Sequence, residues 1–195
     1  MNTEPLKQDH FKIAPQGKEE ESYLSGRGAQ FNTQNRFLKN HQAKEEIESI
    51  DDWEVPNPGT QYIEQQVKSI VNKVDSPDLG MAYSMNPYAG CEHGCIYCYA
   101  RNVHEYWGYS AGLDFESKII VKINAPKMLR KTLMHPKWEV HPIMLSGNPA
   151  CSPTAAHTTR FQRGLLEVCN EFNQPVGILT KNSWIIKDKD ILQEM

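Results

Sequence analysis

The second half of the chain alternates between short apolar runs and longer amphipathic stretches. The short runs are rich in β-branched residues, as in KIIVKI and PVGILT, and they predict strands. The predicted strands cover 81–86, 118–123, 142–146 and 175–180. The predicted helices cover 96–106, 125–134, 158–172 and 184–193. Strands that alternate with helices in this way indicate an α/β fold with parallel strands and right-handed crossovers.

The N-terminal part of the chain has a different, polar pattern. Its stretch SGRGAQFNTQNRF (25–37) has little hydrophobic period and predicts an extended or disordered arm, although a plain solvated tail explains it equally well. Residues 61–74 place apolar side chains at helical spacing, but their tyrosine, isoleucine and valine are also compatible with a strand. Ser-Pro-Asp at 76–78 then breaks the chain. We therefore predict a polar, partly disordered N-terminal extension over 1–75 and a core domain over 76–195.

Composition narrows the class of protein. The 195 residues are 39% hydrophobic, enough for a core, and they include no apolar run long enough to cross a bilayer. The N-terminus lacks an apolar stretch after a basic start, which favours a cytoplasmic protein with no membrane partner. The net charge of −3 provides no general attraction to nucleic acid. Five cysteines, three of them crowded, are typical of metal binding in a reducing compartment rather than of a disulfide framework.

The crowded cysteines are Cys91, Cys95 and Cys98, in the spacing C-x3-C-x2-C. Their loop follows a predicted strand and precedes a predicted helix. We therefore expect it at the carboxyl end of a parallel sheet, where such folds keep their active sites. Gly90 and Gly94 allow the backbone to turn tightly between the thiols. Four cysteines would complete a zinc site or saturate a [4Fe–4S] cluster, whereas three leave one iron of a cluster open to another ligand.

A structural zinc site is the competing interpretation of this loop. His93 or His104 would then supply the fourth ligand. The two remaining cysteines have simpler explanations. Cys169 lies on the apolar face of a predicted helix and is interpreted as a buried core thiol. Cys151 is either a plain loop cysteine, which is favoured, or a thiol that donates hydrogen at a reactive site.

Aromatic and cationic side chains near the loop each have two interpretations. The aromatic residues would stack on a nucleobase or, as is favoured, form core or lid; they are Tyr99, Tyr106, Trp107 and Tyr109. The cations would contact phosphates or, as is favoured, form a solvated helix face. They are Arg101, Lys118, Lys122, Lys127, Arg130 and Lys131.

The loop CEHGCIYC at 91–98 resembles the signature loop of the radical S-adenosylmethionine (SAM) enzymes, including the aromatic residue before the third cysteine. Its flanks, NPYAGCEHGCIYCYAR and then HEYWGYSAGLDFESKIIVK, resemble a narrower subfamily. That subfamily is related to spore photoproduct lyase and is described as DNA repair photolyase-like. SGRGAQFN, LSGN, LLEVC and ILTKNS are similar to the same subfamily, so the resemblance covers 25–195 with gaps.

The resemblance implies two cofactors, a [4Fe–4S] cluster and SAM. The three loop cysteines would ligate the cluster, and SAM would bind the open iron through its amino and carboxylate groups. Tyr97 would lie beside the adenine. Ser146 and Lys181, each at the carboxyl end of a predicted strand, would contact the methionine part of SAM, where a lysine can meet a carboxylate.

The resemblance also implies a fold and an activity. The fold would be the N-terminal half of a radical-SAM partial (βα)6 TIM-like barrel, with parallel strands and flanking helices, so that 76–195 would form an incomplete core domain. A one-electron reductant would drive the reductive cleavage of SAM to a 5′-deoxyadenosyl radical in a lyase-like enzyme, with damaged DNA as the implied substrate. A non-catalytic zinc or iron–sulfur module and an inactive fragment of such an enzyme are the alternatives.

Overall fold

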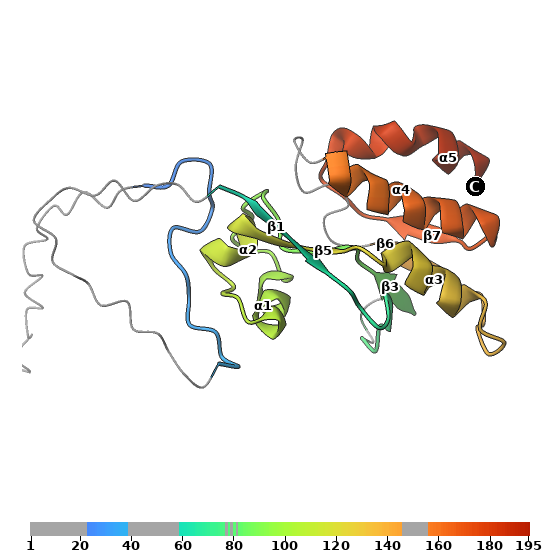
Figure 1. The fold of residues 1–195 in the computed structure, drawn as a ribbon, viewed down its shortest axis with the longest axis horizontal. Helices are drawn as coiled ribbons and strands as arrows, with labels where there is room; N and C mark the ends of the chain where they lie inside the picture. The colour runs from blue at the N-terminus through green and yellow to red at the C-terminus, as the bar shows by residue number, and fades with distance from the viewer. Residues whose placement is uncertain (1–22, 39–58, 77, 79, 81, 146–155) are drawn as a thin grey trace, which may run out of the picture.

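The computed structural model describes residues 23–38, 59–76, 78, 80, 82–145 and 156–195. Within this part the chain forms mixed α/β structure with two separate sheets (Figure 1). The larger sheet consists of β2 (Val71–Lys73), β3 (Tyr83–Met85), β6 (Ile143–Leu145) and β7 (Val176–Ile178). Its strand order is β2-β3-β6-β7, with β3, β6 and β7 parallel and β2 antiparallel to β3. Three of the four predicted strands therefore lie side by side and parallel.

The fourth predicted strand lies in the smaller sheet. This sheet consists of β1 (Gln61–Gln65), β4 (Tyr88–Ala89) and β5 (Lys118–Lys122). The β5 strand has β1 parallel on one edge and β4 antiparallel on the other, so both of its edges are taken. This pairing separates β5 from the larger sheet, and the described residues include no closed barrel. Both β1 and β2 come from the stretch before residue 75.

The helices occur close to their predicted positions. They are α1 (Arg101–His104), η1 (Glu105–Trp107), α2 (Leu113–Ser117), α3 (Ala125–Leu133), α4 (Ala156–Glu171), η2 (Ser183–Asp188) and α5 (Lys189–Glu194). The helix predicted over 96–106 begins only at Arg101, because the chain before it forms turns such as Cys98 N–H to Cys95 O at 3.1 Å. The α2 helix was not predicted. None of the helices in the described ranges is both long and apolar enough to cross a membrane.

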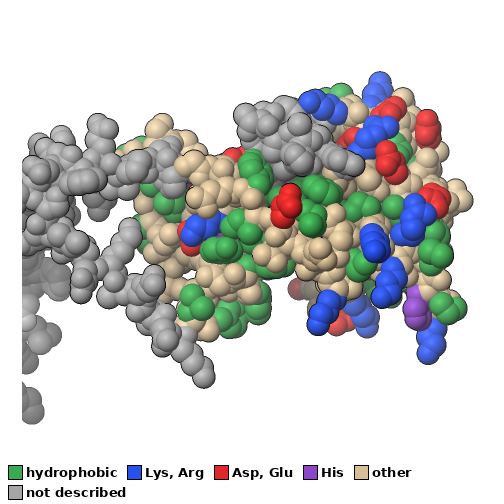
Figure 2. All heavy atoms as spheres, viewed as in Figure 1, with side chains coloured by type: hydrophobic (Ala, Val, Ile, Leu, Met, Phe, Trp, Pro, Cys, Tyr) green, Lys and Arg blue, Asp and Glu red, His purple; other side chains and the backbone are tan. Residues whose placement is uncertain are grey.

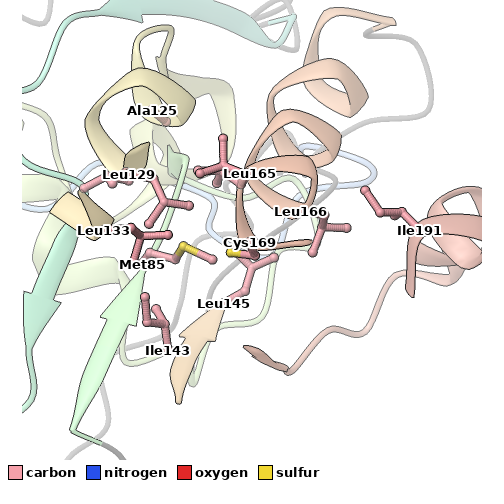
Figure 3. Packing of buried hydrophobic residues seen from close by; sticks show 12 residues of the cluster. Met85, Ala125, Leu129, Leu133, Ile143, Leu145, Leu165, Leu166, Cys169 and Ile191 are labelled. Carbon is pink, nitrogen blue, oxygen red and sulfur yellow. The ribbon is translucent and has the colours of Figure 1, made fainter. Parts of the chain in front are cut away.

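The principal core lies between the larger sheet and the helices α3, α4 and α5 (Figure 3). Its buried members include Met85, Ala125, Leu129, Leu133, Ile143, Leu145, Leu165, Leu166, Cys169 and Ile191. Fully burying such an aliphatic side chain contributes about 1.5–3 kcal/mol to stability. The predicted burial of Cys169 is confirmed, and burial raises the pKa of its thiol to about 12.

The helices of this core begin and end where local chemistry requires. The α3 helix has Pro126 in its first turn, where proline's missing N–H has no intrahelical partner to lose. The α4 helix ends before Asn173, whose φ of 48° is left-handed. The next N–H, that of Gln174, donates to the carbonyl of Cys169 at 2.8 Å and so closes the helix. The polypeptide then turns directly into β7.

Candidate metal centre in the cysteine loop

The cysteine loop (residues 91–98) starts directly after β4 and Gly90. Gly90 has φ of 96°, and a Cβ there would lie 2.9 Å from the carbonyl oxygen of Phe115. The next residue, Cys91, donates its backbone N–H to that same carbonyl at 2.8 Å. Within the loop, Gly94 has φ of 65°. Glycine is therefore required at two turns that determine where the thiols are placed.

All three cysteines of the loop are partly buried. The backbone N–H of His93 points to the sulfur of Cys91 at 3.4 Å, as backbone donors do around thiolates. Three thiols on one short, glycine-turned loop are the kind of donor set that a [4Fe–4S] cluster with one open iron would take. In the described part of the chain, no three His, Cys, Asp or Glu side chains are gathered closely enough to hold a metal ion.

A lysine from the far end of the sequence reaches this loop. Lys181 follows β7, and its Nζ lies 3.3 Å from the sulfur of Cys95 and 2.6 Å from the hydroxyl of Tyr97. The same ammonium lies 4.7 Å from the centroid of the Tyr97 ring. Hydrogen bonds to Tyr97 and then to Cys95 raise the pKa of Lys181. The fold thus brings together Cys95, Tyr97 and Lys181, three residues that the resemblance assigns to one site.

The remaining predicted contacts are placed differently. Ser146 and Cys151 lie outside the described residues. His93 is exposed on the loop, whereas His104 is fully buried between Tyr109 and Phe115. Neither ring nitrogen of His104 has a hydrogen-bond partner in the described structure, and burial lowers its pKa to about 4.

Several cations considered for phosphate binding are instead held by protein groups. Arg101 is buried and pairs with the carboxylate of Glu116. Lys118 forms an ion pair with Asp114 at 3.0 Å. The Nζ of Lys122 donates to a backbone carbonyl at 2.8 Å, and burial lowers its pKa. Arg101 is therefore buried and Lys122 partly buried, rather than part of a solvated helix face, and all three cations have partners within the protein.

Cavities lie elsewhere on the molecule. One of about 250 Å³ is lined by Lys68, Met128, Lys131, Thr132, His135, Lys137 and Trp138. Another of about 400 Å³ lies beside the C-terminal ends of α4 and α5. On the face drawn in Figure 2, Lys and Arg side chains gather over the end that carries α3, α4 and α5, away from α1 and α2. We infer no substrate pocket from these cavities, since none of their lining residues belongs to the cysteine loop.

Sequence reasoning missed the polar residues that surround the loop. Glu116 on α2 is fully buried and accepts hydrogen bonds from the backbone of Gly28 and Ala29. A charged residue in a short polar segment gives no periodic sign of burial. The only signal was the pair of glycines in SGRG, which indicates a close backbone approach without naming its partner.

Comparison with known proteins gives relatives but no described activity. No family model matches the chain, and no solved structure matches it. Uncharacterized proteins of Mycobacterium bovis and Mycobacterium tuberculosis are each 32% identical over 137 residues, which are 70% of this chain and 40% of the relative. An uncharacterized protein of Methanocaldococcus jannaschii is 27% identical over 138 residues, 71% of this chain and 49% of the relative. The chain therefore spans less than half the length of these curated relatives.

Proposed function

We propose that this chain belongs to a radical SAM iron–sulfur protein of the photolyase-like type. It would bind a [4Fe–4S] cluster and SAM, with a one-electron reductant as partner and damaged DNA as substrate. The fold in this proposal is part of a (βα)6 barrel, supported by the parallel order β3-β6-β7. The cytoplasm, a reducing compartment, is the proposed location.

The observation that carries the proposal is the approach of Lys181 to Cys95 and Tyr97. These residues are separated by more than eighty positions, yet Lys181 Nζ lies 3.3 Å from the Cys95 sulfur. A zinc module requires only its ligands, whereas the resemblance to the radical SAM enzymes implies a lysine that meets the methionine carboxylate of SAM. A lysine beside the thiols therefore favours the SAM interpretation over a purely structural metal.

The residues would divide the work as follows. Cys91, Cys95 and Cys98 would hold the cluster through three thiolates, leaving one iron for SAM. A bound and reduced cluster would supply the one electron that the reductive cleavage of SAM requires. Lys181 would leave the Tyr97 hydroxyl and pair with the carboxylate of SAM. Tyr97, whose side chain is 77% exposed, would then be free to lie against the adenine.

The test is anaerobic reconstitution with iron and sulfide, followed by electron paramagnetic resonance of the reduced protein with and without SAM. We expect a [4Fe–4S]⁺ signal that changes when SAM is added. Zinc in place of iron, or a cluster indifferent to SAM, would contradict the proposal. Damaged DNA becomes worth testing as a substrate only after the first result.

Two cysteine variants provide a matched control. Cys95→Ala removes a proposed ligand, and we expect it to abolish the cluster. Cys169→Ala removes a buried core thiol, and we expect it to retain iron while losing some stability. Equal loss of iron in the two variants would show that iron binding does not depend on the loop in particular.

A further inference from the structure

The polar network around Glu116 connects three parts of the chain that are distant in sequence. The carboxylate accepts the backbone N–H of Gly28 at 2.9 Å and that of Ala29 at 2.9 Å. It also pairs with the guanidinium of Arg101. A fully buried carboxylate is stable only when such charge-assisted donors surround it. Removing any one donor is therefore expected to loosen the whole junction.

Arg101 carries this network into the cysteine loop. Its Nε donates to the carbonyl oxygen of Cys95 at 2.9 Å, and its Nη1 donates to the carbonyls of Ala111 and Gly112, both at 3.1 Å. One guanidinium thus fixes the backbone of a proposed cluster ligand to the turn before α2. The planar fork of arginine suits this task, whereas lysine offers a single point charge.

The loop also meets the N-terminal segment backbone to backbone. A Cβ added to Gly28 would lie 1.8 Å from the carbonyl oxygen of Gly94, a distance that no side chain tolerates. Gly94 is equally restricted, since its own Cβ would lie 2.9 Å from the Gly28 nitrogen. The two glycines allow the segments to approach so closely that side chains are excluded between them.

The segment around Gly28 is held along its length. We call residues 27–36 the arm. Arg27 donates to the carbonyl of Glu116 at 2.8 Å, and Asn35 donates to the carbonyls of Glu105 and Tyr109 at 2.9 and 2.8 Å. Arg36 forms an ion pair with Glu105 at 2.7 Å. The arm therefore follows α1, η1 and α2, which are the elements that come directly after the cysteine loop.

We propose that the arm is a brace for the cysteine loop. Gly28, Glu116 and Arg101 act as positioning residues that fix the backbone at Gly94 and Cys95 and so hold the thiols in one arrangement. Bracing of the loop is a property of the protein without cofactor. Its consequence for a cluster rests on the proposed function, and the experiment treats the two separately.

The first measurement uses the full chain without metal. Gly28→Ala inserts a methyl group against Gly94, whereas Gly59→Ala is the matched control, because a Cβ there meets nothing within 4 Å. We measure trypsin cleavage after Arg36 and alkylation of Cys95 and Cys98 by mass spectrometry. We expect cleavage to be about tenfold faster in Gly28→Ala, which corresponds to a free energy of arm opening lowered by about 1.4 kcal/mol. Cleavage of Gly59→Ala should stay as in the wild type. Alkylation of the loop thiols should rise in parallel.

Cys169 serves as an internal reporter of global unfolding, because it is fully buried in the principal core between the larger sheet and α3, α4 and α5. If Gly28→Ala exposes Cys169 as well, the variant has unfolded, and Glu116→Gln decides instead, since it preserves the shape of the side chain. Faster cleavage and alkylation with Cys169 protected support the brace. Rates equal to those of Gly59→Ala, or of the wild type for Glu116→Gln, overturn it.

The second measurement uses the reconstituted protein. We expect Gly28→Ala and Glu116→Gln to release iron to a chelator several-fold faster than Gly59→Ala and to broaden the resonance of the reduced cluster. If the wild-type chain binds no iron, the proposed function is contradicted. The brace is then tested by the metal-free measurements alone. Variants that keep iron and resonance as the wild type does, while the arm is released, show that bracing does not extend to the cluster and overturn that part of the proposal.

Discussion

The two ends of the molecule are stabilised in different ways. The core beneath β3 and β6 consists mainly of apolar side chains from these strands and from α3, α4 and α5 (Figure 3). A buried carboxylate, Asp188, lies beside it at the start of α5 and accepts a hydrogen bond from the buried Gln162 of α4 at 2.8 Å. The region of α1 and α2, together with the arm, contains a buried ion pair, a buried histidine and backbone groups that donate to a carboxylate. Figure 1 shows these parts at opposite ends of the ribbon, with β5 running between them.

Because of this difference, the two regions are expected to respond differently to amino-acid substitutions. An aliphatic core loses stability roughly in proportion to the volume removed and accepts substitutions that conserve size. A buried polar network fails when one partner is removed, because the partner left behind is desolvated and unpaired. We infer that the core determines how stable the chain is, whereas the polar network determines how the cysteine loop is arranged.

The largest change in stability is expected from a substitution in the aliphatic core. Leu129→Ala removes a fully buried side chain between α3 and the sheet, and we expect the free energy of unfolding to fall by about 2–5 kcal/mol. Chemical denaturation followed by circular dichroism measures this change. In the native state the alkylation rates of Cys95 and Cys98 should stay as in the wild type, because the described core cluster that holds Leu129 includes no residue of the arm or of the cysteine loop. A parallel rise in those rates would show that the two regions are not independent.

The same division explains what could be predicted from the sequence. The four strands and the helices over 125–134 and 158–172 were located correctly because apolar residues recur with a regular period in this half of the chain, whereas the helix predicted over 96–106 begins only at Arg101. Periodicity also predicted that Cys169 is buried, and the cysteine spacing drew attention to the loop. The assignment of Tyr97 and Lys181 to one site came from the resemblance and not from any pattern, and their direct contact was not predicted.

The polar end was not predictable in this way. Nothing in the sequence around Glu116 distinguishes a buried carboxylate from a solvated one, since its burial depends on backbone donors from Gly28 and Ala29. The arm is polar because it pairs with polar groups, and composition alone cannot separate that case from disorder. The placement of β5 in its own sheet depends on β1, whose strand character was ambiguous in the sequence.

The second-largest expected effect is a loss of stability in acid that arises from buried His104 at the polar end. His104 has a pKa of about 4 in the folded protein, lowered by burial from an unfolded value near 6.5, while Asp114 raises it and Lys118 lowers it slightly. Between pH 6.5 and pH 4 the imidazole of His104 is therefore protonated in the unfolded chain but stays neutral in the folded chain. Stability is full above pH 6.5 and falls as the pH drops toward 4, by on the order of 3 kcal/mol in total.

His104→Phe keeps an aromatic ring beside Tyr109 and Phe115 and removes this proton. Urea unfolding at a series of pH values between 7.5 and 4 should show a shallower loss of stability in the variant than in the wild type. The gap between the two curves should widen steadily below pH 6.5. Parallel curves would mean that the buried imidazole contributes nothing to acid sensitivity, and the polar end would then be less fragile than the comparison holds.

The smallest expected effect tests whether the core depends on polar contacts. The indole Nε1 of Trp138 donates to the Gln174 side-chain oxygen at 3.1 Å, and its ring packs on Tyr83 with centroids 4.9 Å apart. Trp138→Phe keeps an aromatic ring there and removes the donor. We expect a loss of about 1 kcal/mol, because only the side-chain oxygen of Gln174 loses its donor, while the amide nitrogen retains its bonds to the carbonyls of His141 and Pro175. Thermal unfolding measures the change. A loss as large as that of Leu129→Ala would show that this core, like the arm, depends on single polar partners, and the contrast between the two ends would fail.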